Sequence, residues 1–88
     1  MIQNKLFRSC LAAVPEEQKA IFELSYNIAD RICKILKEQN LTQKEFASKM
    51  HKRESEISKW LTGRHNFTMQ TIVKIEQTLN CKLITIAE

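Results

Sequence analysis

The sequence predicts an all-α fold for this chain of 88 residues. Its apolar residues recur every three or four positions over most of its length, which is the period of an amphipathic helix. It contains one glycine and one proline, too few for the many turns of an all-β fold. Hydrophobic residues make up 43% and charged residues 27%, as in one folded domain rather than a disordered segment. We expect about five helices, followed by a short C-terminal β-strand.

Residues 1–14 carry a weak helical pattern. Apolar side chains recur there at intervals of four, as in Ile2, Leu6, Cys10 and Val14. A short amphipathic helix and a frayed tail are both open for this part of the chain.

The helical domain is expected to occupy residues 15–80, and its first helix to run from Pro15 to about Asn40. Proline loses no hydrogen bond at the first helical position, and the two glutamates after it complement the helix dipole. Asn40 suits a left-handed stop. We expect the half of this helix nearer Asn40 to pack on the domain and the other half to extend beyond it. The apolar stripe comprises Ile21, Leu24, Ser25, Ile28, Ile32 and Ile35.

Two short helices are predicted next. Residues 41–46 (Leu-Thr-Gln-Lys-Glu-Phe) combine a capping box with the two apolar residues of a hydrophobic staple. A helix therefore begins at Gln43 and ends near His51, where the apolar pattern is interrupted. A second helix covers about 54–62, and Gly63 provides its stop.

A last helix is predicted up to Asn80, with Thr68 as its cap and Phe67 and Ile72 as its staple. The final segment, 81–88, alternates and is rich in β-branched residues, which predicts the strand. Trp60 is expected to be buried and structural. The rest of the predicted core consists of Ile32, Leu36, Phe46, Ala47, Met50, Ile57, Leu61, Phe67, Ile72, Ile75 and Leu79.

The two short helices and the turn between them form a helix-turn-helix at residues 42–63. From about residue 28 to residue 79, the chain resembles the Xre/Cro family of bacterial DNA-binding regulators. The resemblance is carried by the stretch LTQKEFASKM–HKRE–SEISKWLTG, with the Leu-Thr-Gln opening, Ala47, the Ile-Ser-x-Trp sequence and Gly63 at the family's positions. It departs from the pattern at His51, where the family usually has glycine, and at Lys52, where it has an apolar residue.

This resemblance implies a lambda-repressor-like fold and sequence-specific binding of double-stranded DNA by a transcriptional repressor. Ser55 and Lys59 match the base-reading positions, with Glu54 at the start of the recognition helix. Lysine can donate to guanine and glutamate can accept from cytosine. The DNA-binding residues expected from the resemblance are Gln43, Arg53, Glu54, Ser55, Ser58, Lys59, Arg64, Asn66 and Thr68.

Three further points belong to this interpretation. Gln43 matches the position that bridges a phosphate to the recognition helix. Arg64, His65, Asn66 and the amide end of the helix at Thr68 resemble a clamp on the DNA backbone. Two alternatives stay open: contact of Lys59 with phosphate alone, and a purely capping role for Glu54.

The charge distribution supports two different surfaces. The net charge is +4, but residues 31–66 hold nine basic and four acidic side chains, whereas residues 15–30 hold four acidic and one basic. A basic middle beside an acidic flank predicts a polyanion-binding face and a second surface. The runner-up function is an antitoxin that binds a toxin protein and autoregulates its operon, because the compact size, the acidic extra helix and the terminal strand resemble the HigA- and HipB-type antitoxins of the same family.

Other function classes find little support. His51 and His65 have no cysteine or carboxylate at a catalytic or metal-binding spacing, and the three cysteines show no CxxC pattern. We expect no enzyme activity, no cofactor and no metal. No apolar run approaches the roughly 20 residues that span a bilayer, and no signal-peptide core is present. We therefore expect a cytoplasmic protein without membrane contact.

A homodimer is also expected, because one helix-turn-helix reads about half of a two-fold operator. The predicted strand at 82–86 has no ladder partner in its own chain, so pairing with its symmetry mate would satisfy both backbones. The stripe from Ile21 to Ile35 is expected to support it. The alternative is a strand that folds back and is covered by the helices of one monomer.

Overall fold

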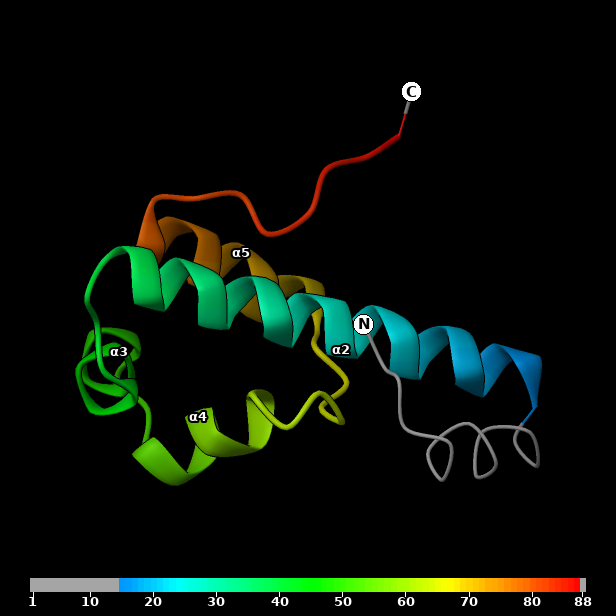
Figure 1. The fold of residues 1–88 in the computed structure, drawn as a ribbon, viewed down its shortest axis with the longest axis horizontal. Helices are drawn as coiled ribbons and strands as arrows, with labels where there is room; N and C mark the ends of the chain where they lie inside the picture. Colours follow the sequence, from blue (N-terminus) through cyan, green and yellow to red (C-terminus); the bar gives the residue numbers. More distant parts are fainter. Residues whose placement is uncertain (1–14, 88) are drawn as a thin grey trace.

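The computed structural model describes residues 15–87 and contains, within that range, four α-helices and no strand. In chain order these are α2 (Glu16–Glu38), α3 (Gln43–Met50), α4 (Glu54–Trp60) and α5 (Met69–Leu79), arranged as Figure 1 shows. The predicted all-α class is confirmed. The fifth predicted helix falls within residues 1–14, which lie outside the described residues.

Helix α2 begins and ends as the sequence predicts. Pro15 is its N-cap, and Glu16 and Glu17 stand in the first turn. Its buried side chains all come from residue 25 onward, and its first turns extend past the other helices (Figure 1). Leu24, expected on the buried stripe, is 58% exposed, whereas the adjacent Ser25 is 5% exposed. The half of α2 near Asn40 packs on the domain, as predicted.

Three helices are followed by a residue with a left-handed backbone. Asn40, His51 and Asn80 have φ values of 55°, 57° and 54°. After His51, the amide of Lys52 donates to the carbonyl of Ala47 at 2.9 Å. Histidine thus adopts the conformation that glycine usually supplies at this turn, at a modest steric cost.

The capping signals form as expected. The amide of Glu45 donates to Thr42 Oγ1 at 3.0 Å, and the amide of Thr42 donates to Glu45 Oε1 at 2.9 Å. The hydrogen bond from the Thr42 amide holds the pKa of Glu45 below its ordinary value. Thr68 caps α5 in the same way, by accepting from the Thr71 amide at 3.1 Å. Local sequence therefore fixes where α3 and α5 begin.

Gly63 is required for two reasons. Its φ is +82°, a conformation that side chains rarely adopt, and it lies against α2. A Cβ at this position would lie 2.9 Å from Tyr26 Cδ1 and 3.3 Å from Tyr26 Cα. Helix α4 ends at Trp60, two residues earlier than the sequence indicated, and a turn over 61–63 leads to this contact.

One hydrophobic core joins the four helices. Most of the predicted core is buried, whereas Leu61 and Phe67 are only partly buried, because they lie at its edge. Trp60 is 5% exposed, which confirms its burial. The residues that extend the predicted core are Ile28, Ala29 and Ile35 on α2.

The predicted C-terminal strand is wrong for the described chain. Residues 81–87 form no strand, because no neighbouring strand offers a ladder, and side chains bind this backbone instead. Glu76 Oε2 accepts from the amides of Leu83 at 2.8 Å and Ile84 at 3.3 Å, while Arg31 Nε donates to the Lys82 carbonyl at 3.3 Å. Leu83 packs on the core, whereas the outer side chains stay exposed. The helices of this chain therefore anchor the segment without covering it.

We predict that Gly63→Ala destabilises the fold. Both the positive φ and the crowding against Tyr26 oppose a methyl group there, so the loss should be about 1–3 kcal/mol. Urea denaturation of the two proteins measures it. Asn40→Gly is the matched control, because glycine relieves a left-handed backbone and should not destabilise. An alanine variant as stable as the parent would contradict this account of Gly63.

Candidate nucleic-acid interface

Helices α3 and α4 pack against each other through small and aromatic side chains. Ala47 is 3% exposed, and its small side chain lets the helices cross closely. The rings of Phe46 and Trp60 meet edge to face, with centroids 6.4 Å apart. Ile57 is completely buried beside them. This contact fixes the inner face of α4, so its other face is turned to solvent (Figure 1).

The outer face of α4 carries the predicted base-reading residues. Glu54, Ser55 and Lys59 are exposed, and so are Ser58 and the preceding Arg53. Glu56 is partly buried. The structure thus brings the five predicted residues of this region to the surface of one short helix and its N-cap.

A hydrogen bond joins the start of α3 to the outer part of α4. Ser58 Oγ donates to Gln43 Oε1 at 3.0 Å, across fifteen residues of sequence. Both side chains are exposed. This bond fixes the Gln43 carboxamide beside the recognition helix, and its nitrogen carries two N–H donors at the edge of the surface.

The loop from α4 to α5 is ordered by its own polar groups. Thr62 Oγ1 donates to the Lys59 carbonyl at 2.7 Å and accepts from the Arg64 amide at 3.3 Å. Arg64 and Asn66 are exposed. The Thr68 hydroxyl accepts from the Thr71 amide and donates to Thr71 Oγ1 at 2.9 Å, so capping occupies it. At this end of α5, the backbone amides of the first turn are therefore the groups that can donate to a phosphate.

His65 belongs to the aromatic packing rather than to the charged surface. Its ring lies 5.8 Å from that of Trp60 and 4.8 Å from that of Phe67, measured between centroids. Burial lowers the pKa of His65 below its ordinary value of 6.5. The imidazole therefore contributes packing to this loop, and its place in the clamp stays a prediction.

Positive charge exceeds negative charge on this side of the molecule. The described residues contain two ion pairs, Lys19–Glu16 and Lys34–Asp30, and both lie within α2. The basic side chains of α3, α4 and their loops thus have no acidic partner among the described residues. They are Lys44, Lys49, Lys52, Arg53, Lys59 and Arg64, all of them exposed.

The basic run around the turn extends the predicted site. Lys49 and Lys52 flank His51 and are exposed, although the family resemblance assigned a role only to Arg53 in this stretch. The signal was present in the sequence as a cluster of three basic residues within 49–53. A residue-by-residue comparison with the family misses such charges, because their effect depends on the summed charge of a region rather than on the residue at one position.

Among residues 15–87, no group of three or more His, Cys, Asp or Glu side chains is placed to hold a metal ion. None of the helices in this part of the chain combines the length and apolar character that crossing a membrane requires.

A family model described as helix-turn-helix matches residues 32–86, which include the second part of α2 and all of α3, α4 and α5. The match covers more than half of the chain. No curated protein and no solved structure matches the chain.

We predict that acid destabilises the fold through His65. Because its pKa is lowered on folding, the unfolded chain binds more protons as the pH falls through 6.5, and stability decreases. Thermal unfolding at about pH 7.5 and about pH 5.5 should show a smaller acid loss for His65→Phe than for the parent. His51→Asn, at an exposed left-handed position, should keep the parent's loss. Equal losses in all three proteins would refute this role of His65.

Proposed function

Because the chain belongs to the helix-turn-helix family of DNA-binding regulators, we propose that it represses transcription by binding specific sites in double-stranded DNA as a two-fold dimer. The observation that carries this proposal is the outer face of α4. It presents Ser55, Ser58 and Lys59 to solvent on a helix whose inner face is buried. A helix presented in this way fits the major groove, where base edges differ from one base pair to the next.

Within this proposal, base reading and backbone contact come from different parts of the surface. Lys59 donates to guanine O6 or N7, and Glu54 accepts from cytosine N4. The Gln43 carboxamide, fixed by Ser58, donates to a phosphate. Arg64, Asn66 and the first-turn amides of α5 hold the backbone beyond the recognition helix. The unpaired basic residues add attraction for DNA of any sequence.

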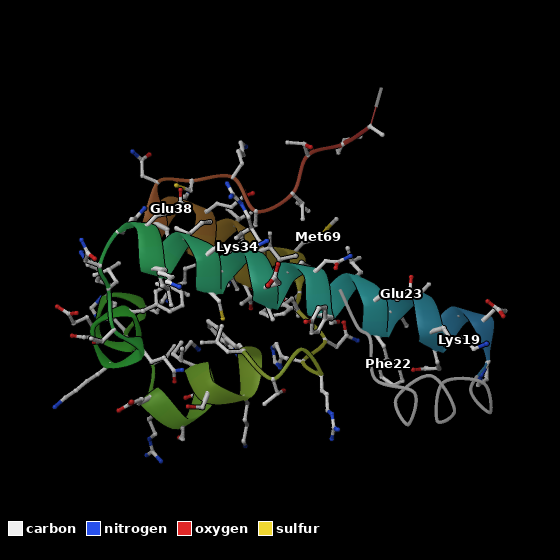
Figure 2. The ribbon with its side chains drawn as sticks, viewed as in Figure 1. Lys19, Phe22, Glu23, Lys34, Glu38 and Met69 are labelled. Atoms are coloured by element: carbon white, nitrogen blue, oxygen red, sulfur yellow. The ribbon has the colours of Figure 1, made fainter. Side chains whose placement is uncertain are left out.

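A second function, that of an antitoxin, is favoured by the N-terminal part of α2. This part extends beyond the other helices, and Figure 2 shows Lys19 and Glu23 on it. It carries Glu16, Glu17 and Glu23, an acidic surface separate from α4. An acidic helix of this kind suits a basic protein partner.

Co-expression tests the antitoxin role. If a neighbouring gene encodes a protein that stops growth, this chain should restore growth and purify with that protein. Replacing the acidic residues of α2 by glutamine should prevent rescue and leave DNA binding unchanged. If the chain restores growth against no neighbouring gene product, the antitoxin role is excluded and only the role in transcription remains.

We predict that Lys59→Ala relaxes base preference at one position of the site. After selection of a cognate site from random duplexes, the variant should bind it roughly 1–3 kcal/mol more weakly and bind random DNA with little change. Lys74→Ala removes the same charge from an exposed position on α5 and should not change base preference. An equal loss of affinity for cognate and random DNA would instead show that Lys59 contacts a phosphate.

We predict a different result for Arg64→Ala. A phosphate contact is independent of sequence, so affinity should fall to a similar extent on all DNA. The plot of log affinity against log salt should become shallower by about 0.9, the value for one phosphate. An unchanged slope would exclude a phosphate contact of Arg64.

A further inference from the structure

The loop between α4 and α5 presents Arg64 from a backbone that is held on both sides. The Arg64 side chain is exposed, whereas its neighbours Gly63 and His65 pack inward. Gly63 is buried against Tyr26 of α2. The ring of His65 lies 5.8 Å from that of Trp60, measured between centroids. The loop is therefore attached to α2 immediately before Arg64 and to α4 immediately after it.

One hydroxyl group connects this loop directly to the end of α4. Thr62 Oγ1 donates to the Lys59 carbonyl at 2.7 Å and accepts from the Arg64 amide at 3.3 Å. The Thr62 amide donates to the same carbonyl at 3.3 Å. Lys59 lies in the last turn of α4, where carbonyl groups lack partners within the helix. The hydroxyl therefore satisfies the end of the helix and fixes the backbone from which the Arg64 side chain extends.

The hydrogen bonds of Thr62 leave it without a donor for DNA. A threonine hydroxyl has one hydrogen to donate, and the Lys59 carbonyl accepts it at the shorter of the two distances. A phosphate oxygen needs a donor, which this hydroxyl already uses within the protein. Thr62 is also exposed, so it contributes little to the core. Its effect on DNA binding is therefore expected to pass through the groups that it holds.

The position of Arg64 relative to α4 matters for recognition. Phosphate contacts set the register and orientation of a protein on the duplex, and base contacts then read the sequence. Both kinds of contact form together only if Lys59 and Arg64 keep a fixed spacing along the DNA. Fixing the backbone of Arg64 before binding also reduces the entropy that is lost when its side chain meets a phosphate.

We propose that Thr62 is a positioning residue for DNA binding, whose hydroxyl holds Arg64 in register with α4 so that the guanidinium meets a phosphate when α4 enters the major groove. The inference rests on the proposed function and adds to it a residue that is not among the expected DNA contacts. Thr62 acts here through the backbone of Arg64.

Removal of the hydroxyl tests this role on a cognate duplex selected from random sequences. Thr62→Val should bind about three- to tenfold more weakly than the parent, the range of one net hydrogen bond. Its plot of log affinity against log salt should become shallower, toward the slope of Arg64→Ala. Thr62→Ser keeps the hydroxyl and should restore both values. Thr62→Ala, a second variant without the hydroxyl, should match Thr62→Val, and circular dichroism checks that each variant is folded.

A matched control removes a hydroxyl elsewhere. Thr85 is exposed on the C-terminal segment, which Figure 1 shows on the other side of α2 from α4. Thr85→Val should therefore bind the duplex like the parent. Full affinity and an unchanged salt slope in Thr62→Val would overturn the proposal.

A double-mutant cycle shows whether Thr62 acts through Arg64. In the Arg64→Ala background, Thr62→Val should cause little further loss of affinity, because the group that it positions is already absent. Losses that add fully would show that the hydroxyl acts independently of Arg64, and they would overturn the positioning role.

A measurement without DNA separates this inference from the proposed function. The ¹⁵N relaxation order parameter of the Arg64 amide should be about 0.85 in the parent, as for a rigid backbone, and should decrease in Thr62→Val but not in Thr62→Ser. An equal order parameter in all three proteins would overturn the positioning role even if the parent binds DNA. If the order parameter decreases as expected but the parent selects no duplex, Thr62 fixes Arg64 and the proposed function is refuted.

Discussion

The packing of α4 on α3 and α2 is the constraint on which the rest of the structure depends. Ile57 and Trp60 are buried against Phe46 and Ala47, and the turn after α4 brings Gly63 against Tyr26 of α2. These contacts leave one face of a seven-residue helix exposed. Because such a short helix is unstable alone, tertiary packing supplies both its stability and its orientation.

Polar groups position the surface that this packing exposes. The Ser58–Gln43 hydrogen bond ties the recognition helix to the start of α3, and the Thr62 hydroxyl orders the loop that carries Arg64. His65 contributes packing, because its ring contacts those of Trp60 and Phe67. Among the proposed DNA contacts, the side chains of Gln43 and Ser58 and the backbone at Arg64 are therefore held in place.

The molecule has two further surfaces that differ in chemistry. The start of α2 is acidic and extends from the domain, and the C-terminal segment presents apolar side chains beside α5. Hydrogen bonds from Arg31 and Glu76 hold the C-terminal segment in place, although it has no strand partner.

The sequence by itself determined the helices and the motif. The capping box at Thr42, the cap at Thr68, the left-handed stop at Asn40 and the end of a helix near His51 are local signals, and each formed where it was predicted. Exposure of the residues on α4 followed from the helical period. The sequence could not show what the extended segment after Asn80 would bind, because β-pairing needs a partner distant in the chain. Only the tertiary structure placed Arg31 and Glu76 beside that backbone, so hydrogen bonds from helices replaced the expected ladder.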